Sequence, residues 1–305
     1  MEKSEFNPFV SADAKRQYLS MYDEKAKNWP VPSETRMIDT TYGQTFVRIS
    51  GPAGAPPLVL LPGMGSDSLS WIPYARALSG PYRIYAVDAI GNYGRSIPVK
   101  DLTVIDDYMS WLDELLTAMQ LRDGISLTGM SYGGMLAGQY ALRHPERLRK
   151  VVLLAPAATV LPTSQAFTLR LISSLLPARF FTKRLYFWLY EDFLREDPAN
   201  RAKAKEIVDE KILAGKSFRR DRPVPPAIMT DEELQGIKVP VLYVVGEHEK
   251  IYSAVEAIAR LKKVAPQIRT EVIPRAGHDL NLVRAEMVNR IVLDFLGSRD
   301  VTGSA

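Results

Sequence analysis

The chain of 305 residues contains no cysteine and only three histidines. Without cysteine it can form neither a disulfide framework nor a thiolate metal site, and three scattered histidines argue against a zinc centre. No apolar run approaches the roughly 18 residues of a membrane-spanning helix, and the amino-terminal MEKSEFNPFV lacks the apolar core of a signal peptide. We therefore expect a cytoplasmic protein with no metal, no other cofactor and no stable insertion into a membrane.

Clustered charge is also scarce, although the formal net charge is +4. The basic residues are dispersed or occur in short pairs such as Lys183 and Arg184, without the aromatic-interleaved basic cluster that is typical of nucleic-acid-binding proteins. A mildly basic, solvated surface explains the charge, so no nucleic-acid partner is expected. The oligomeric state stays open.

Short apolar runs alternate with helical stretches along the chain, which indicates an α/β fold with parallel strands. The predicted strands are Phe46–Ile49, Leu58–Leu61, Arg83–Val87, Ile125–Met130, Val151–Leu154, Val241–Val245 and Glu271–Ile273. An amino-terminal stretch from Ser11 to Asn28 carries Tyr18, Met21 and Tyr22 at helical spacing before two prolines end the pattern. We expect this helix to pack at an edge of the sheet or over an inserted segment.

The stretch from Ile125 to Leu142 predicts a buried strand, a tight turn and a helix, with Ser131 at the apex. Gly129, Ser131 and Gly133 form the G-x-S-x-G pattern, in which a strained turn exposes the serine hydroxyl. The first amides of the following helix stabilise negative charge that develops above the serine. A glycine-rich turn without chemical function is the alternative, but the flanking strand and helix favour a nucleophile for acyl transfer.

A serine hydroxyl needs a base, because it is a poor nucleophile at neutral pH. His144 ends the helix that begins after Ser131, where it suits a structural role, and His248 stands between two glutamates in an exposed loop. His278 follows the last predicted strand on a loop, the place where catalytic groups gather in open α/β sheets. We therefore predict His278 as the base.

A carboxylate must orient that histidine. No aspartate or glutamate occurs between Lys150 and Tyr190, so the acid is expected after the next strand, where Glu247 and Glu249 compete. Glu249 is favoured and Glu247 is held in reserve, because the more distal residue can leave the strand end and reach a neighbouring loop.

The oxyanion of acyl transfer requires two backbone amides. We predict the amide of Tyr132, directly after the nucleophile, and the amide of Met64 in the glycine-rich turn after the strand Leu58–Leu61. A phosphate-binding loop is the alternative for Gly63–Gly65, but the turn has neither a third glycine at the dinucleotide spacing nor Gly-Lys-Ser/Thr.

With these motifs the chain resembles the α/β-hydrolase superfamily, from about Thr40 to Phe295. The turn Val87–Ser96 and the Ala-Gly-His at His278 add to the likeness, which is greatest to bacterial carboxylesterase-type serine hydrolases. The resemblance implies an eight-stranded, mostly parallel sheet with helices on both faces and an inserted, mobile helical cap. The predicted division is an amino-terminal helical segment (1–35), a core (36–156 and 236–300) and a cap (157–235).

Three departures from the family pattern concern the site. Pro62 stands where a histidine is usual, so proline rigidity or other contacts must hold the oxyanion loop. The predicted acid is Glu249 instead of aspartate, and the turn after Asp88 has an additional residue between Gly91 and Gly94. Because position 131 is serine, the related branches with a carboxylate nucleophile are not expected.

The predicted cap is dense in aromatic residues at helical spacing, a pattern that favours packing over ligand binding. One face of such an insert nevertheless lies toward the nucleophile, so some aromatics are expected to line an apolar substrate pocket; they are Phe180, Phe181, Tyr186, Phe187, Trp188 and Tyr190. Arg170, Arg179, Lys183 and Arg184 could attract an anionic substrate or a lipid surface, but solvated helix faces are the default explanation.

These residues together predict a cofactor-independent carboxylic ester hydrolase that forms an acyl-enzyme on Ser131. Its expected small-molecule partners are substrates, small to medium apolar esters. Two alternatives remain. The same triad could cleave carbon-carbon bonds or act as a perhydrolase, or the chain could be a non-catalytic ligand-binding relative that keeps the pocket.

Overall fold

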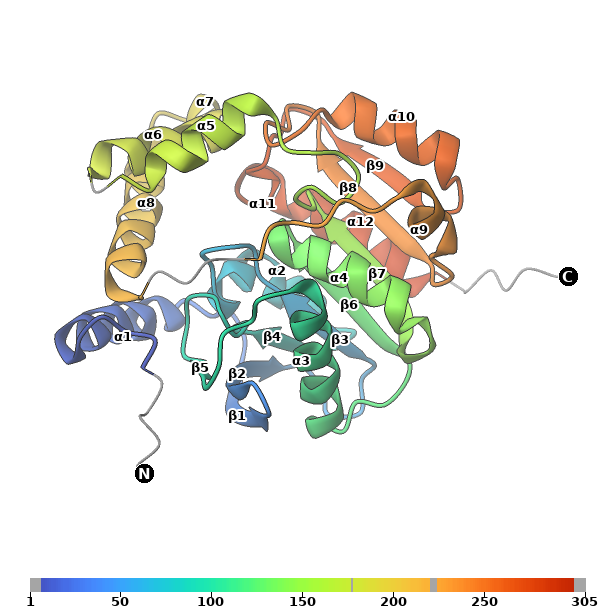
Figure 1. The fold of residues 1–305 in the computed structure, drawn as a ribbon, viewed down its shortest axis with the longest axis horizontal. Coiled ribbons are helices and arrows are strands. Elements are labelled where there is room, and N and C mark those ends of the chain that lie inside the picture. The colour runs from blue at the N-terminus through green and yellow to red at the C-terminus, as the bar shows by residue number, and fades with distance from the viewer. Residues whose placement is uncertain (1–6, 177, 220–223, 299–305) are drawn as a thin grey trace, which may run out of the picture.

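A central, mostly parallel sheet carries the fold of the computed structural model (Figure 1), which describes residues 7–176, 178–219 and 224–298. Residues 1–6, 177, 220–223 and 299–300 of the predicted segments lie outside these ranges. Eight strands follow the order β1-β2-β4-β3-β6-β7-β8-β9, and the two-residue β5 pairs with β2. The bounds are β1 Glu34–Thr40, β2 Gly43–Ser50, β3 Pro57–Leu61, β4 Arg83–Val87, β5 Ile97–Pro98, β6 Ile125–Met130, β7 Leu148–Leu154, β8 Val241–Gly246 and β9 Arg269–Ile273.

The period-two alternation of the strands builds one apolar core on each face of the sheet. In β3, Val59 and Leu61 pack into one cluster, while Leu58 and Leu60 pack into the other. The first cluster is covered by α3 (Ile105–Ala118), α4 (Tyr132–Arg143) and α10 (Ala254–Val264). The second is covered by α1 (Ala12–Ala26), α2 (Ile72–Leu78) and α12 (Ala285–Gly297). The predicted α/β class is therefore confirmed.

The sequence pattern did not predict β1, which pairs antiparallel with β2 at the edge of the sheet. Its sequence ETRMIDT is polar, and its residues are exposed or half-buried. An edge strand has no need of an alternating apolar face, because its register is set by main-chain pairing with its single neighbour.

Helix α1 forms where the sequence pattern predicts it. Ser11 caps its first turn by accepting a hydrogen bond from the Ala14 amide at 3.1 Å. Its buried face presents Tyr18 and Tyr22, whose hydroxyls reach Asp67 Oδ2 at 3.1 Å and Ser68 Oγ at 3.0 Å. The helix thus packs beside the loop that follows β3.

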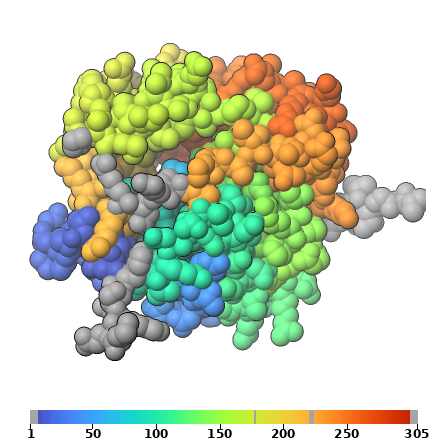
Figure 2. Space-filling model, in the orientation of Figure 1, coloured from blue at the N-terminus to red at the C-terminus, as the bar shows by residue number. Residues whose placement is uncertain are grey.

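Four helices between β7 and β8 form a layer of their own above the carboxyl edge of the sheet (Figure 1). We call them the insert: α5 (Gln165–Ser174), α6 (Arg179–Leu189), α7 (Glu191–Glu196) and α8 (Asn200–Ser217). In Figure 2 the surface is hollowed between the yellow-green insert and the core below it. After α9 (Asp231–Gly236) the chain re-enters the sheet, and α11 (Leu280–Val283) precedes α12. None of the described helices is long and apolar enough to cross a membrane.

Candidate active site

Ser131 stands at the corner between β6 and α4 with φ 52° and ψ −116°, a conformation that non-glycine residues rarely adopt. Main-chain bonds fix this corner: the Ser131 amide donates to Leu154 O at 2.9 Å, and Ser131 O accepts from the amides of Met135 and Ala157 at 3.0 and 3.1 Å. Strain of this kind costs on the order of 1–3 kcal/mol and persists only where the surroundings impose it. The hydroxyl is thereby held clear of the helix.

The flanking glycines are sterically required. A Cβ on Gly129 would lie 2.0 Å from Gly133 O, and a Cβ on Gly133 would lie 2.4 Å from Leu61 O. Both clashes would be with main chain, which cannot yield as a flexible side chain does. The G-x-S-x-G pattern therefore reflects how closely β6, α4 and the end of β3 approach one another.

Ser131, His278 and Glu249 meet from three distant parts of the chain. His278 Nε2 lies 3.1 Å from Ser131 Oγ, and His278 Nδ1 lies 3.0 Å from Glu249 Oε2. The Glu249 side chain is fully buried, and its Oε1 accepts from the amides of Lys250 and Ile251 at 2.8 and 2.9 Å. The carboxylate thus lies in a fixed orientation, with its second oxygen directed at the imidazole.

The surroundings of His278 favour its protonated form. Burial by itself lowers the pKa of the imidazole, but the charge of Glu249, the hydrogen bond with it and the charge of Asp279 together raise the pKa above its ordinary value. An imidazole of raised basicity suits a group that takes a proton from a hydroxyl.

The other candidate residues lie apart from this contact. Glu247, the reserve acid, accepts from the Arg275 amide at 2.8 Å. His144 stacks on Tyr140 with ring centroids 4.6 Å apart. His248 was expected to be an exposed histidine flanked by its neighbouring glutamates. Its side chain is indeed 44% exposed, but its Nδ1 lies 3.0 Å from Asp192 Oδ1 on α7. Sequence spacing gives no signal for this partner, which lies 56 residues away.

The predicted oxyanion loop lies against the nucleophile, since a Cβ on Gly63 would meet the Ser131 Cβ at 3.3 Å. Within the part of the chain that the structure describes, neither the Met64 amide nor the Tyr132 amide donates to an acceptor of the protein. An oxyanion hole would require two such unpaired donors.

Two side chains that the sequence analysis missed hold this loop. Asn92 Nδ2 donates to Gly63 O at 2.8 Å, and Asn92 Oδ1 accepts from the Gly65 amide at 2.7 Å. Lys211 of α8 donates to Gly65 O and to Ser66 Oγ, both at 2.6 Å. These are the other contacts expected where Pro62 replaces histidine. The additional residue in the turn after Asp88 was the one available signal for Asn92.

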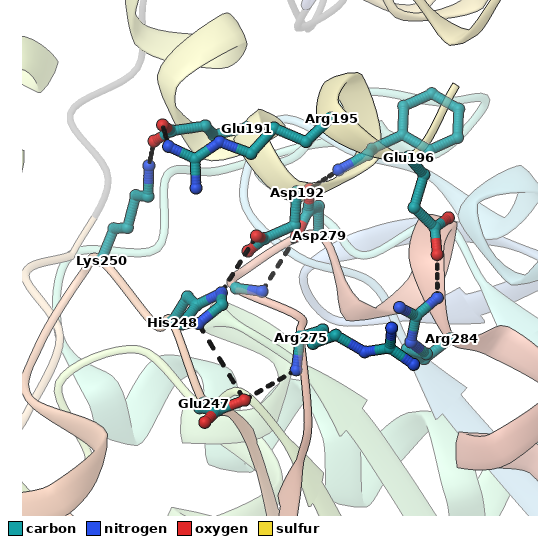
Figure 3. Close-up of polar contacts among 12 residues, drawn as sticks. Glu191, Asp192, Arg195, Glu196, Glu247, His248, Lys250, Arg275, Asp279 and Arg284 are labelled. Atoms are coloured by element: carbon teal, nitrogen blue, oxygen red, sulfur yellow. Dashed lines mark hydrogen bonds and ion pairs between the residues drawn. The ribbon is translucent and has the colours of Figure 1, made fainter.

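Helix α7 of the insert attaches to the loops that carry Glu249 and His278 (Figure 3). Asp192 contacts His248, Glu191 pairs with Lys250, and the Phe193 amide donates to Asp279 Oδ2 at 2.9 Å. Burial, and to a smaller extent the charge of Asp192, raise the pKa of Asp279 despite its two hydrogen bonds from amides. A further ion pair joins Glu196 to Arg284. We call these contacts the α7 attachment.

A small hollow, partly open to solvent, lies beside the oxyanion loop. It is lined by core residues, most of them apolar: Leu61, Pro62, Met64, Ala89, Ile90, Gly91, Asn92, Tyr108, Tyr132 and Leu136. None of the six insert aromatics is among them. Phe180 is exposed, whereas Tyr186 comes close to the loop, since a Cβ on Gly65 would lie 3.8 Å from its hydroxyl.

Several of the proteins that this chain resembles are named carboxylesterases. The model of the alpha/beta hydrolase family matches residues 58–291. The uncharacterized carboxylesterase nap of Bacillus subtilis is 34% identical over 92% of this chain and 93% of its own. Carboxylesterase YbfK of the same organism is 31% identical over 94% and 96%. The crystal structure of naproxen esterase from Bacillus subtilis superposes with a TM-score of 0.84 at 34% identity, covering 93% of this chain and 99% of that one. The chain therefore belongs to the α/β-hydrolase family, as a serine hydrolase of the carboxylesterase type.

Proposed function

We propose that this enzyme hydrolyses carboxylic esters through an acyl-enzyme intermediate, with Ser131 as nucleophile, His278 as proton carrier and Glu249 as the orienting acid. The observation that carries the proposal is the pair of contacts at His278, 3.1 Å to Ser131 and 3.0 Å to Glu249. The names of the carboxylesterase relatives support the same chemistry.

In the first half-reaction Ser131 Oγ attacks the ester carbonyl while its proton passes to His278 Nε2. The tetrahedral intermediate collapses when the C–O bond to the alcohol breaks and the histidine returns the proton to the departing oxygen. In the second half-reaction water attacks the acyl-enzyme and gives its proton to His278, which then protonates Ser131 as the acid leaves. Glu249 keeps the Nδ1 proton facing itself and stabilises the imidazolium in both steps.

The amides of Met64 and Tyr132 are proposed to bind the oxyanion. In enzymes where one such donor has been removed by mutation, the transition state has lost roughly 3–4 kcal/mol of stabilisation. Their position beside the nucleophile and their lack of an acceptor in the described part of the protein support this role.

The substrates are proposed to be small to medium apolar esters, because the hollow beside the loop is lined mainly by aliphatic and aromatic groups. Residues 157–235 are proposed to act as the cap over this site. Their helices α5–α8 interrupt the core between two neighbouring parallel strands and contact the loops of the site through the α7 attachment.

Hydrolysis of p-nitrophenyl esters of increasing acyl length tests both the reaction and the substrate class. Ser131→Ala and His278→Ala are each expected to lower kcat by about 10⁴- to 10⁶-fold with the fold unchanged. Ser11→Ala, which removes a hydroxyl from the cap of α1, should keep wild-type kinetics. Near-native hydrolysis by Ser131→Ala, or failure of a fluorophosphonate to label Ser131 in the wild type, would contradict the proposal.

A further inference from the structure

In the oxyanion loop, residues 63–66, the predicted donor is the Met64 N–H. Its peptide group carries one hydrogen-bond acceptor, the carbonyl oxygen of Gly63. Gly63 O and the Met64 N–H belong to the same peptide unit. Such units are planar, and none in the described chain is cis, so carbonyl and N–H point in opposite directions. Whatever fixes the direction of Gly63 O therefore fixes the direction of the Met64 N–H.

The Ser66 amide donates to that carbonyl at 3.2 Å, and Asn92 makes the shorter bond to it while also holding the peptide that follows. Its Nδ2 donates to Gly63 O at 2.8 Å and its Oδ1 accepts from the Gly65 amide at 2.7 Å. The side chain thus bridges the peptides on both sides of the Met64 Cα. Only a side-chain amide presents a donor and an acceptor side by side in this way, because a carboxylate lacks the donor and a hydroxyl is too small to reach both groups.

The turn that carries Asn92 is itself fixed. The Asn92 amide donates to Ala89 O at 3.1 Å, and the buried carboxylate of Asp88 accepts from the amides of Ser68 and Arg95 at 2.7 and 2.8 Å. Gly94 adopts φ 134°, and a Cβ there would lie 2.5 Å from the Asp88 carboxylate. Asn92 therefore acts from a rigid support.

We propose that Asn92 is a positioning residue of the oxyanion hole, which aims the Met64 N–H at the carbonyl oxygen of an ester bound at Ser131. The inference rests on the ester hydrolysis proposed above. Asn92 touches no reacting atom in this role. Pro62 has no side-chain hydrogen bond to give this loop, and Asn92 supplies two of them from the turn that departs from the family pattern by an additional residue.

The test compares Asn92→Ala, Asn92→Asp and the matched control Asn289→Ala. Asn289 is buried, whereas Asn92 is half-buried, and the Asn289 amide donates to Pro73 O on the α2–α12 side of the sheet. For p-nitrophenyl butyrate, Asn92→Ala is expected to lower kcat roughly 10- to 100-fold while KM stays within about threefold of wild type. The fall in kcat should not exceed the effect of losing one oxyanion donor. Asn92→Asp keeps the size of the side chain but sets a carboxylate against Gly63 O, so its loss of kcat should be at least as large.

Inhibition by phenylboronic acid is a measurement that a purely structural role of Asn92 would leave unchanged. It forms a tetrahedral adduct with a nucleophilic serine, so its inhibition constant should weaken in parallel with kcat in the Asn92 variants. The acid limb of the pH profile, which reports His278, should stay in place. Asn289→Ala should lose stability without either kinetic change.

The inference is overturned if Asn92→Asp folds and both its kcat and its phenylboronic acid inhibition constant stay within about threefold of wild type. A change in KM alone overturns it equally. Failure of the underlying function looks different, because Ser131→Ala would then retain hydrolysis whatever the Asn92 variants do.

Discussion

The carboxyl edge of the sheet is tightly constrained and buried, whereas part of the insert above it is exposed. At the sheet edge Ser131 is held by main-chain bonds, the Glu249 side chain is fully buried, and the neighbouring glycines leave no room for a Cβ. In the insert, α5 has no buried residue, and Leu169 and Phe180 are 68% and 63% exposed. Catalytic groups need a fixed geometry, whereas a covering segment must admit different substrates.

The two regions meet at few places, and each contact reaches a different part of the site. The α7 attachment contacts the loops of the acid and the histidine, and Lys211 of α8 contacts the oxyanion loop. If this contrast holds, substitutions at the sheet edge should lower kcat, while substitutions in the insert should chiefly change the free energy of unfolding and the access of substrate to the site. Three predictions test this division.

The largest effect is expected at Glu249. Glu249→Gln keeps the shape of the side chain but removes the charge that orients His278 and raises its pKa. We expect kcat to fall by about 10³- to 10⁴-fold. Because the pKa of His278 should also fall, the acid limb of kcat/KM against pH should move to lower pH. Steady-state kinetics from pH 5 to 9 measure both effects.

Glu247→Gln is the matched control, because Glu247 accepts from the Arg275 amide and not from His278. Its kcat should stay within a few-fold of wild type. A larger loss in Glu247→Gln than in Glu249→Gln would show that the acid has been assigned to the wrong residue.

A smaller effect is expected at the α7 attachment. Asp192→Ala removes the nearly buried partner of His248 and should lower the free energy of unfolding by about 1.5 kcal/mol, the low end of the usual range for a hydrogen bond to a charged group, because His248 is 44% exposed. Hydrogen exchange of the α7 amides should accelerate, while kcat for a small ester stays within about threefold. Urea unfolding, hydrogen exchange and kinetics on one preparation measure all three.

Glu206→Ala, which removes an exposed carboxylate of α8, should change stability by less than about 0.5 kcal/mol. If Asp192→Ala instead loses kcat a hundredfold without faster exchange in α7, the insert takes part in catalysis and the contrast between the two regions fails.

The sequence was most informative where function depends on local geometry. The G-x-S-x-G corner could be recognised in the sequence because Gly129 and Gly133 lie so close to main chain that only glycine fits there. The alternating strands were predicted for the same reason, since each of their faces enters an apolar core. The membership of the α/β-hydrolase family and the carboxylesterase type, both expected from these motifs, are confirmed.

The sequence was least informative where contacts join distant, polar segments. Strand β1 is polar because its pairing needs only main chain, so no pattern marked it. Asp192 and His248 are 56 residues apart, and nothing in either stretch specifies the other. Asn92 was not predicted for a related reason: an extra residue in a turn signals a difference, but only the folded loop shows that the Asn92 side chain bonds Gly63 O and the Gly65 amide.

The smallest predicted effect concerns Lys211 and the dependence of stability on pH. Burial, and then the charge of Lys25 on α1, lower the pKa of Lys211 to about 8, against the attraction of Asp67 and Glu210. The unfolded chain keeps this proton up to about pH 10.5, so between pH 8 and 10.5 the unfolded state binds more protons than the native state. By linkage, this group makes stability rise with pH in that window.

Lys211→Met retains the apolar stem and removes the titration, so the variant should lack this rise. A full proton difference contributes about 1.4 kcal/mol per pH unit, and partial solvent access reduces it, so we expect a difference on the order of 1 kcal/mol between pH 7.5 and 9.5. Urea unfolding at both pH values measures it, with the exposed Lys216→Met on the same helix as control. Parallel stability curves for Lys211→Met and wild type would mean that native Lys211 keeps its proton as firmly as the unfolded chain does, so that the contact between α8 and the oxyanion loop adds no dependence of stability on pH between pH 7.5 and 9.5.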